Sequence, residues 1–185
     1  MTPASQLRPD ERLAPDVLNL GCGAKKMASA LNVDSQESIG PDRVIDLNAR
    51  PWPLPTSHFR EIHAYDVIEH LDDVVASLEE IHRVGRAGAV LHLTVPHFSC
   101  ANAFTDPTHK HYFGEQSFHY FTGEHGHAHY TQVRFRRLET SIVFHPTLLN
   151  KVVHRLAKAR PAAYERRWAW MFPAWFLYAR LEVVK

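Results

Sequence analysis

The sequence predicts an open α/β sheet of mostly parallel strands, and three features lead to this prediction. Between Val17 and Pro96 there are five short runs rich in Val, Ile and Leu, each closed by Gly, Pro or Asp, as is typical of buried parallel strands. An amphipathic helix separates the fourth run from the fifth. Two more strand-like runs follow late in the chain, which favours antiparallel pairing at one edge of the sheet.

The five early strands are expected in the order in which the runs occur. They are 17–21 (VLNLG), 31–34 (LNVD), 43–47 (RVIDL), 61–68 (EIHAYDVI) and 89–96 (AVLHLTVP). The stretch PWPLP stops the third run, because proline cannot donate to a sheet ladder.

A helix is predicted in the segment 71–88, between the fourth and fifth strands. Its apolar residues recur at helical spacing. Asp72 and Asp73 stand at its start, where carboxylates favour the helix N-terminus, and Gly85 and Gly88 are expected to end it. Strand, helix and strand together make a right-handed βαβ unit.

After Pro96 the alternation of strands and helices stops. The segment 97–134 is rich in His, Phe, Tyr, Thr and Gly. A long loop within a compact domain is usually functional, so we assign this segment to the functional site.

The C-terminal part predicts a strand at 136–146, a basic amphipathic helix at 147–160, an aromatic helix at 164–176 and a last strand at 176–185. Residues 147–185 contain eight Lys and Arg but only two Glu. We favour a helical cover over 147–176, with its aromatic side chains packed on the sheet. The alternatives are contact with a membrane surface or a lipid-linked substrate, and a homodimer contact.

Composition excludes several classes of protein. The chain has 185 residues, a formal net charge of +1 and 45% hydrophobic residues, which fits one globular domain and argues against a nucleic-acid partner. Cys22 and Cys100 are too few for a disulfide scaffold and fit a reducing compartment. Residues 1–16 form a polar leader without the features of a signal peptide, and no apolar run is long enough to span a membrane. We therefore expect a cytoplasmic protein.

Glycines and acids follow the first three strands in a fixed order. Ligands of open α/β sheets bind beyond the carboxyl ends of the strands. There, Gly21 and Gly23 allow a tight turn and a close approach of the backbone to a ligand. Asp34 can accept hydrogen bonds from ribose hydroxyls, and Asp46 from an adenine amine, while Leu47 packs on the ring. This order favours a nucleoside-shaped ligand over a glycine turn with two unrelated surface acids.

The segments LNLGCG, NVD, VIDLNARPWPLPTSHFREIHAYDVIEHLDD and EEIHRVGRAGAVLHLTVPHF together resemble the class I S-adenosylmethionine-dependent methyltransferases, in the branch with the methyltransferase type 11 domain. The resemblance covers residues 17–98. It implies a Rossmann-like sheet of about seven mostly parallel strands, the last one antiparallel, in a single domain over 17–185. It also implies S-adenosylmethionine as the cofactor, with 97–134 as the loop on the acceptor side.

The same resemblance assigns roles to single residues. The glycine loop that wraps the methionine part of the cofactor corresponds to Leu20, Gly21, Cys22 and Gly23. Asp34 would hold the ribose, and the pair Asp46 and Leu47 would recognise adenine. Tyr65 and Asp66, at the end of the fourth strand, would face the sulfonium and the acceptor.

The loop departs from the family pattern at two positions. Lys25 replaces the usual third glycine, and Asn19 replaces an acid. Because Gly23 and Leu31 are so close in sequence, the first helix should be truncated to a turn or two. Lys25 or Lys26 can pair with the carboxylate of the methionine part; the alternative is a solvated pair of lysines.

Methyl transfer from a sulfonium requires alignment and the exclusion of water, and a hydroxyl or ammonium acceptor also requires a base. Candidates in the long loop are His97, Asp106, His109 and His111, with Asp106 able to orient an imidazole. Together with Asp66 they form the predicted catalytic set.

The histidines also supply ligand types suited to Zn, Fe or Ni. One candidate metal cluster is formed by His97, Asp106, His109 and His111, and a second by His125, His127 and His129. We favour the base over the metal interpretation. The resemblance places Glu69 and His70 at the head of the predicted helix, near the site; the alternative is a polar pair at a helix start, and their role stays open.

These observations predict a methyltransferase acting on an oxygen or nitrogen atom of a small molecule. The alternatives are a His/Asp metal-dependent enzyme built on 97–129 and a nucleoside-binding domain of the same fold without catalytic activity.

Overall fold

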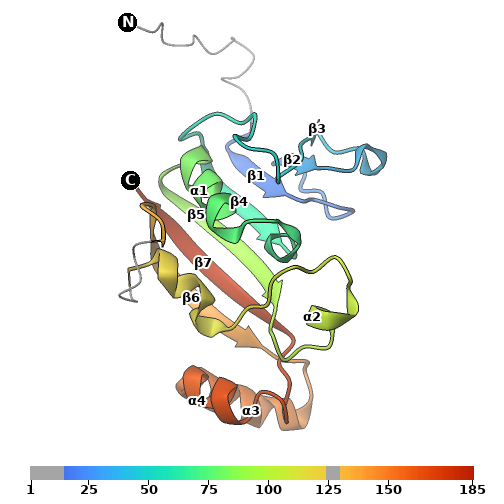
Figure 1. Ribbon diagram of the computed structural model, residues 1–185, viewed down its shortest axis with the longest axis vertical. Coiled ribbons are helices and arrows are strands. Elements are labelled where there is room, and N and C mark those ends of the chain that lie inside the picture. Colours follow the sequence, from blue (N-terminus) through green and yellow to red (C-terminus); the bar gives the residue numbers. More distant parts are fainter. Residues whose placement is uncertain (1–14, 124–129) are drawn as a thin grey trace, which may run out of the picture.

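The computed structural model describes residues 15–123 and 130–185, which form a seven-stranded sheet (Figure 1). Its strands are β1 (Val17–Leu20), β2 (Leu31–Asp34), β3 (Arg43–Val44), β4 (Phe59–Tyr65), β5 (Gly85–Pro96), β6 (Arg134–Val143) and β7 (Phe176–Val184). Most of the leader, and the histidine cluster of 125–129, lie outside the described residues.

The strand order is β3-β2-β1-β4-β5-β7-β6. Strands β1 to β5 pair in parallel, whereas β7 is antiparallel to both β5 and β6. This confirms the predicted open α/β sheet with its antiparallel pairing at one edge. The chain runs outward from β1 to β3 and returns to β4 on the other side of β1, so the strand order reverses between β1 and β4. Ligands of such sheets bind at this reversal.

The helix α1 (Val74–Val84) covers one face of the sheet (Figure 1). The side chain of Asp73 caps its first turn by accepting a hydrogen bond from Ala76 N at 2.9 Å. The helix buries Leu78, Ile81 and Val84. Gly85 ends the helix as predicted, because it is the C-cap and its N–H donates to Ile81 O, and Gly88 lies beyond the helix. Both glycines belong to β5, which begins at Gly85 and is longer than the sequence predicted.

Alternate residues of the central strands form the core. Side chains such as Ile62, Leu91, Leu93 and Leu181 are fully buried, which follows from the two-residue period of a strand. The opposite face is polar. His63 and His92 stack there with ring centroids 5.0 Å apart, and burial lowers the pKa of both imidazoles.

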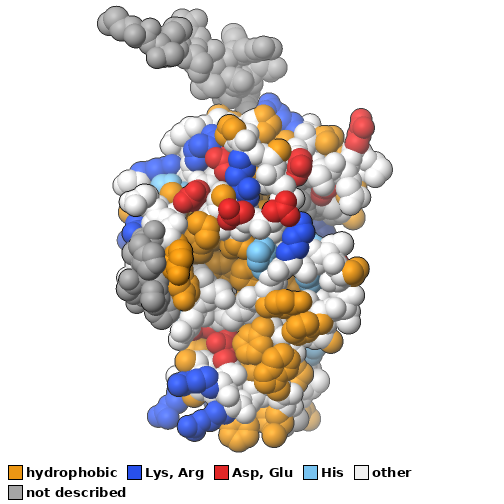
Figure 2. Space-filling model, viewed as in Figure 1, with side chains coloured by type: hydrophobic (Ala, Val, Ile, Leu, Met, Phe, Trp, Pro, Cys, Tyr) orange, Lys and Arg blue, Asp and Glu red, His pale blue; other side chains and the backbone are white. Residues whose placement is uncertain are grey.

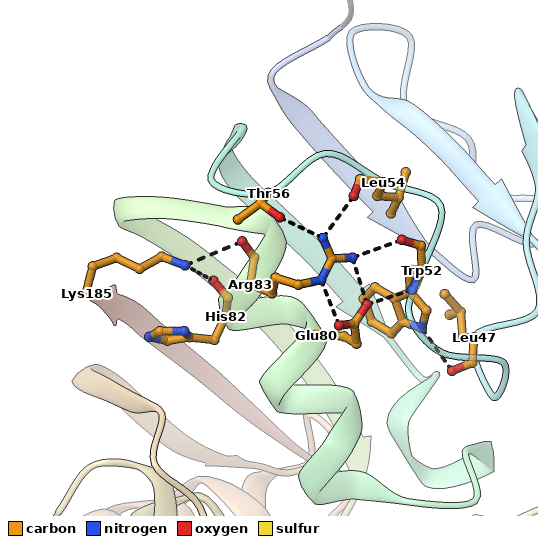
Figure 3. A network of polar contacts seen from close by, with 8 residues as sticks. All are labelled: Leu47, Trp52, Leu54, Thr56, Glu80, His82, Arg83 and Lys185. Atoms are coloured by element: carbon orange, nitrogen blue, oxygen red, sulfur yellow. Dashed lines mark hydrogen bonds and ion pairs between the residues drawn. The ribbon is translucent and has the colours of Figure 1, made fainter. Parts of the chain in front are cut away.

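An arginine of α1 fixes the segment that follows β3 (Figure 3). The Arg83 guanidinium donates to the Glu80 carboxylate at 2.7 and 2.8 Å and to three oxygens of the segment 52–56 at 2.9–3.0 Å. Glu80 also accepts from Trp52 N at 2.7 Å, and the Trp52 indole donates to Leu47 O at 3.0 Å. Although burial raises the pKa of Glu80, these hydrogen bonds outweigh it and hold the pKa below its usual value. The network therefore ties the predicted adenine segment to α1.

The C-terminal helices are α3 (Leu148–Ala159) and α4 (Pro161–Arg167), which lie beyond the end of β6 (Figure 1). The prediction of an aromatic helix over 164–176 is wrong, because α4 ends at Arg167. Pro173 interrupts a helical hydrogen-bond pattern, and the Tyr164 hydroxyl donates to Phe172 O at 2.8 Å, which holds the chain in a turn.

Two tryptophans of this segment do not pack on the sheet as expected: Trp168 and Trp170 are 49% and 70% exposed, and Met171 beside them is 66% exposed. Tyr164 and Phe172, in contrast, pack with the core. Figure 2 shows apolar side chains gathered on the lower surface of the molecule, where α3 and α4 lie in Figure 1, with Lys and Arg side chains beside them. Within the described part of the chain, no helix has the length and apolarity needed to cross a bilayer.

Candidate functional site

The loop after β1 is folded back onto the end of β2. Gly21 and Gly23 have φ values of 55° and 48°, in the left-handed region that favours glycine. Gly23 N donates to Asp34 Oδ2 at 2.9 Å, and Cys22 N donates to Val33 O at 3.0 Å. Asn19, at the position of the family's acid, donates from its side chain to Lys25 O at 3.0 Å. Asn19 therefore supports the loop rather than facing a ligand.

The two glycines are required for different reasons. A Cβ atom on Gly21 would lie 2.5 Å from Val67 Cγ2, so the Val67 side chain leaves no room for a larger residue at this position. A Cβ on Gly23 would have no heavy atom of the described residues within 4 Å. The backbone at Gly23 is therefore open to a bound molecule. Because Leu20 and Cys22 are buried, they can offer a ligand only their backbone.

Asp34 is well placed for a ribose. Its side chain also accepts from Gln36 N at 3.0 Å, and only 9% of the residue is exposed. Each carboxylate oxygen has a second lone pair, which leaves room for donors from a ligand. Of the predicted adenine pair, Asp46 is exposed and accepts from Asn48 N at 2.9 Å, whereas Leu47 is buried. Residue Ile45 donates to Asp34 O at 2.9 Å, which links the ends of β2 and β3.

A cavity of about 840 Å³ adjoins this loop. Four predicted residues line it, namely Tyr65, Asp66, Asp106 and His109, and Lys25 lies at its wall. The volume lies in the range of small-molecule sites. The cavity thus joins the end of β4 to the segment after β5, and Lys25 brings the loop after β1 to its wall. The predicted cofactor residues Leu20, Gly21, Cys22, Gly23, Asp34, Asp46 and Leu47 are not among those that line it.

Asp66 has a strained backbone. Its φ of 56° is unusual for a residue other than glycine, and such strain is concentrated at functional sites. The carboxylate accepts from Thr94 Oγ1 at 2.9 Å and lies 4.0 Å from Lys25 Nζ. The exposed ammonium of Lys25 is therefore free to turn toward a carboxylate in the cavity.

A second group of titratable side chains lies in the cavity wall. The Asp106 carboxylate is 3.8 Å from His109 Nε2 and accepts from Thr108 N at 2.8 Å. Hydrogen bonds from Thr108 lower the pKa of Asp106. Beside them lie His70, whose pKa burial lowers, and Glu69, whose pKa burial raises to about 8.

Two of the predicted catalytic histidines, His97 and His111, lie away from the cavity. His97 is fully buried, with Nε2 3.1 Å from Glu165 and Nδ1 2.8 Å from Ser99 Oγ. His111 places Nε2 2.9 Å from Leu71 O. Neither residue lines the cavity. Both imidazoles join segments of the chain, which is a structural role and not that of a base.

Sequence reasoning missed other residues of the cavity. The resemblance places Glu69 and His70 near the site, and both line the cavity, but the sequence assigns them no role. Trp175 and Phe176 also line the cavity. They come from the start of β7, and no local signal in the sequence connects them with the ends of β4 and β5.

The fold matches solved structures of methyltransferases. An S-adenosylmethionine-dependent methyltransferase from Mesorhizobium loti matches with 15% identity and a TM-score of 0.56, over 90% of this chain and 89% of that chain. A SAM-dependent methyltransferase from Archaeoglobus fulgidus matches with 16% identity and a TM-score of 0.62, over 90% of this chain and 85% of that chain. A putative methyltransferase from Bacillus halodurans matches with 13% identity and a TM-score of 0.59, over 91% of this chain and 92% of that chain.

No family model matches the sequence, and no curated protein matches it. The sheet order, the glycine loop at its reversal and the matches across nine-tenths of the chain agree with one another. The chain therefore has the fold of the class I S-adenosylmethionine-dependent methyltransferases.

Proposed function

We propose that this protein transfers a methyl group from S-adenosylmethionine to an oxygen or nitrogen atom of a small molecule. One observation carries the proposal: the glycine loop, bonded to Asp34 at the reversal of strand order, adjoins a cavity lined by Asp66, Asp106 and His109. A nucleoside donor and an acceptor can thus lie side by side.

The described residues fit the donor. The carboxylate of Asp34 suits the ribose. The open backbone at Gly23 suits the methionine part, and the Lys25 ammonium suits the carboxylate of that part. When bound, S-adenosylmethionine supplies a methyl group already activated on a sulfonium. The protein then has to hold the acceptor in line and exclude water.

We assign proton removal to Asp106. Its side chain is 45% exposed and lines the cavity, so it is accessible to an acceptor hydroxyl or ammonium. Thr108 holds the carboxylate in place with hydrogen bonds at 2.8 Å from N and 2.6 Å from Oγ1. Asp66 lies nearer the glycine loop, beside Lys25, and would help to orient the acceptor.

Calorimetric titration with S-adenosylmethionine and S-adenosylhomocysteine tests the proposal. We expect both to bind at one site per chain and to raise the melting temperature, because a ligand that binds only the native state stabilises it by about 2.7 kcal/mol at 100 times its Kd. Failure of both to bind would refute the proposal. Binding without transfer of a labelled methyl group to any acceptor in a metabolite extract would instead indicate a nucleoside-binding domain without catalytic activity.

The two glycines of the loop provide a matched pair of variants. Gly23→Ala places a methyl group in the open ligand space, so it should weaken S-adenosylmethionine binding at a stability cost of about 1–2 kcal/mol for the left-handed backbone. Gly21→Ala has the same backbone cost and also meets Val67, which should add about 1–3 kcal/mol. Urea unfolding and calorimetry of both variants measure the two effects. Equal stability of the two variants would contradict the conclusion that Gly21 is packed against Val67 while Gly23 faces open space.

A further inference from the structure

Glu69 is a fully buried acid in the cavity wall. It lies in the short 3-10 helix Ile68–His70 that follows β4, and its exposure is 0%. Neither carboxylate oxygen has a hydrogen-bond partner among the described residues. Burying a carboxylate without a partner costs several kcal/mol, and native structures pair such groups or give them an ion. The bare carboxylate therefore indicates a missing partner.

Two imidazoles lie beside this carboxylate. One ligand atom each from Glu69, His70 and His109 falls within 4.8 Å of the others. The rings of His70 and His109 meet edge to face, with centroids 4.6 Å apart. This cluster differs from the metal candidates that the sequence suggested, because His97 and His111 lie elsewhere and the fully buried ligand is Glu69.

Hydrogen bonds prepare both imidazoles for a cation. Thr108 Oγ1 donates to Asp106 Oδ1 at 2.6 Å, so it accepts from His70 Nδ1 at 2.8 Å. His109 Nδ1 lies 3.3 Å from Ala103 O, and a carbonyl can only accept. With their protons on Nδ1, both rings keep the Nε2 lone pair for a metal ion, as in metal sites where a neighbouring acceptor fixes the tautomer.

We propose that Glu69, His70 and His109 bind one divalent transition-metal ion. Two imidazoles and a carboxylate are ligands that Zn²⁺ and related ions accept, and three protein ligands leave positions open for other molecules. All three residues line the cavity. The consequence for the reaction rests on the proposed function. An ion here favours an acceptor that is methylated on a hydroxyl, because a metal ion lowers the pKa of an oxygen-bound proton.

The test is metal binding by the full-length protein without S-adenosylmethionine. Protein stripped with EDTA is dialysed against Zn²⁺, and zinc per chain is measured by mass spectrometry. We expect about one ion per chain for the wild type and for the control His58→Gln, which alters a histidine directly before β4, outside the cavity. The double variant His70→Ala, His109→Ala should lose most of it. Binding of Co²⁺ should give visible absorption bands in the wild type that are lost in the double variant.

Glu69→Gln separates a metal role from a folding role. Without metal, the variant should be about as stable as the wild type, because burial raises the pKa of Glu69 to about 8 and an amide then replaces a mostly protonated carboxyl group of the same shape that has no partner either. With Zn²⁺ present, the melting temperature of the wild type should rise and that of the variant should rise much less. No retained zinc or cobalt in the wild type, or equal retention in the wild type and the cluster variants, would overturn the proposal.

Failure of the metal site and failure of the proposed function give different results. If S-adenosylmethionine binds in EDTA but zinc never binds, the metal proposal is wrong and the methyltransferase proposal stands. If zinc binds and S-adenosylmethionine does not, the reverse holds.

Discussion

Replacing Arg83 with methionine should destabilise the protein by about 3 kcal/mol, at the lower end of the range for breaking a buried ion pair by removing one partner. The substitution leaves the Glu80 carboxylate, 12% exposed, without its bidentate partner. It also removes the donor to three oxygens of the segment 52–56. Urea denaturation measures the change, with the exposed Arg86→Met as a control that should shift stability by less than about 0.5 kcal/mol.

A second variant shows whether the lost charge pair causes the effect. In the double variant Arg83→Met, Glu80→Met the buried carboxylate is gone, so part of the stability should return. Because Trp52 N would still lack its acceptor, recovery should be incomplete. A loss below about 1 kcal/mol in the single variant would show that the network of Figure 3 contributes little to folding.

The same network has a consequence for the binding site. The Trp52 indole donates to Leu47 O, and the segment held by Arg83 continues directly from the predicted adenine pair. Arg83→Met, which releases the segment 52–56, should therefore weaken cofactor binding more than the global loss of stability alone predicts. Local opening of a binding segment requires less free energy than global unfolding.

The sheet could be predicted because its signal is local. Buried parallel strands require short apolar runs, and the run LNVD coincides with β2 (Leu31–Asp34). The aromatic segment after Arg167 was mispredicted because its apolar spacing fits a helix, while the structure depends on a proline and on the contact of Tyr164 with Phe172 O. Such tertiary contacts override propensity and leave no periodic pattern.

For the candidate site too, the sequence predicts some residues and not others. The glycine loop and Asp34 could be predicted because neighbouring strand ends impose their proximity. His97 was misassigned because its position after β5 does not reveal that Glu165, far along the chain, covers it. The environment of Glu69 arises from the long loop, whose Lys110 N donates to Glu69 O at 2.8 Å. No spacing within the sequence encodes that contact.

Replacing Asp34 with alanine should reduce the affinity for S-adenosylmethionine by about 10- to 100-fold. A hydrogen bond to a charged group contributes about 1.5–3 kcal/mol, and 1.4 kcal/mol corresponds to a factor of ten. The substitution also removes the acceptor of Gly23 N, so the loop loses its tie to the end of β2. S-adenosylhomocysteine should lose as much affinity as S-adenosylmethionine, because the two share the ribose. Calorimetric titration of both ligands measures the effect.

Asp34→Asn separates the direct contact from the ordering of the loop. The amide keeps the shape of the side chain and one acceptor oxygen, but that oxygen cannot serve both Gly23 N and Gln36 N as the carboxylate does. We therefore expect an affinity between those of the wild type and Asp34→Ala. The control Glu37→Ala removes an exposed carboxylate from the turn after β2 and should leave affinity unchanged. If Asp34→Ala binds both ligands as the wild type does, the ribose does not lie at the end of β2, and the donor cannot occupy the loop to which Asp34 is bonded.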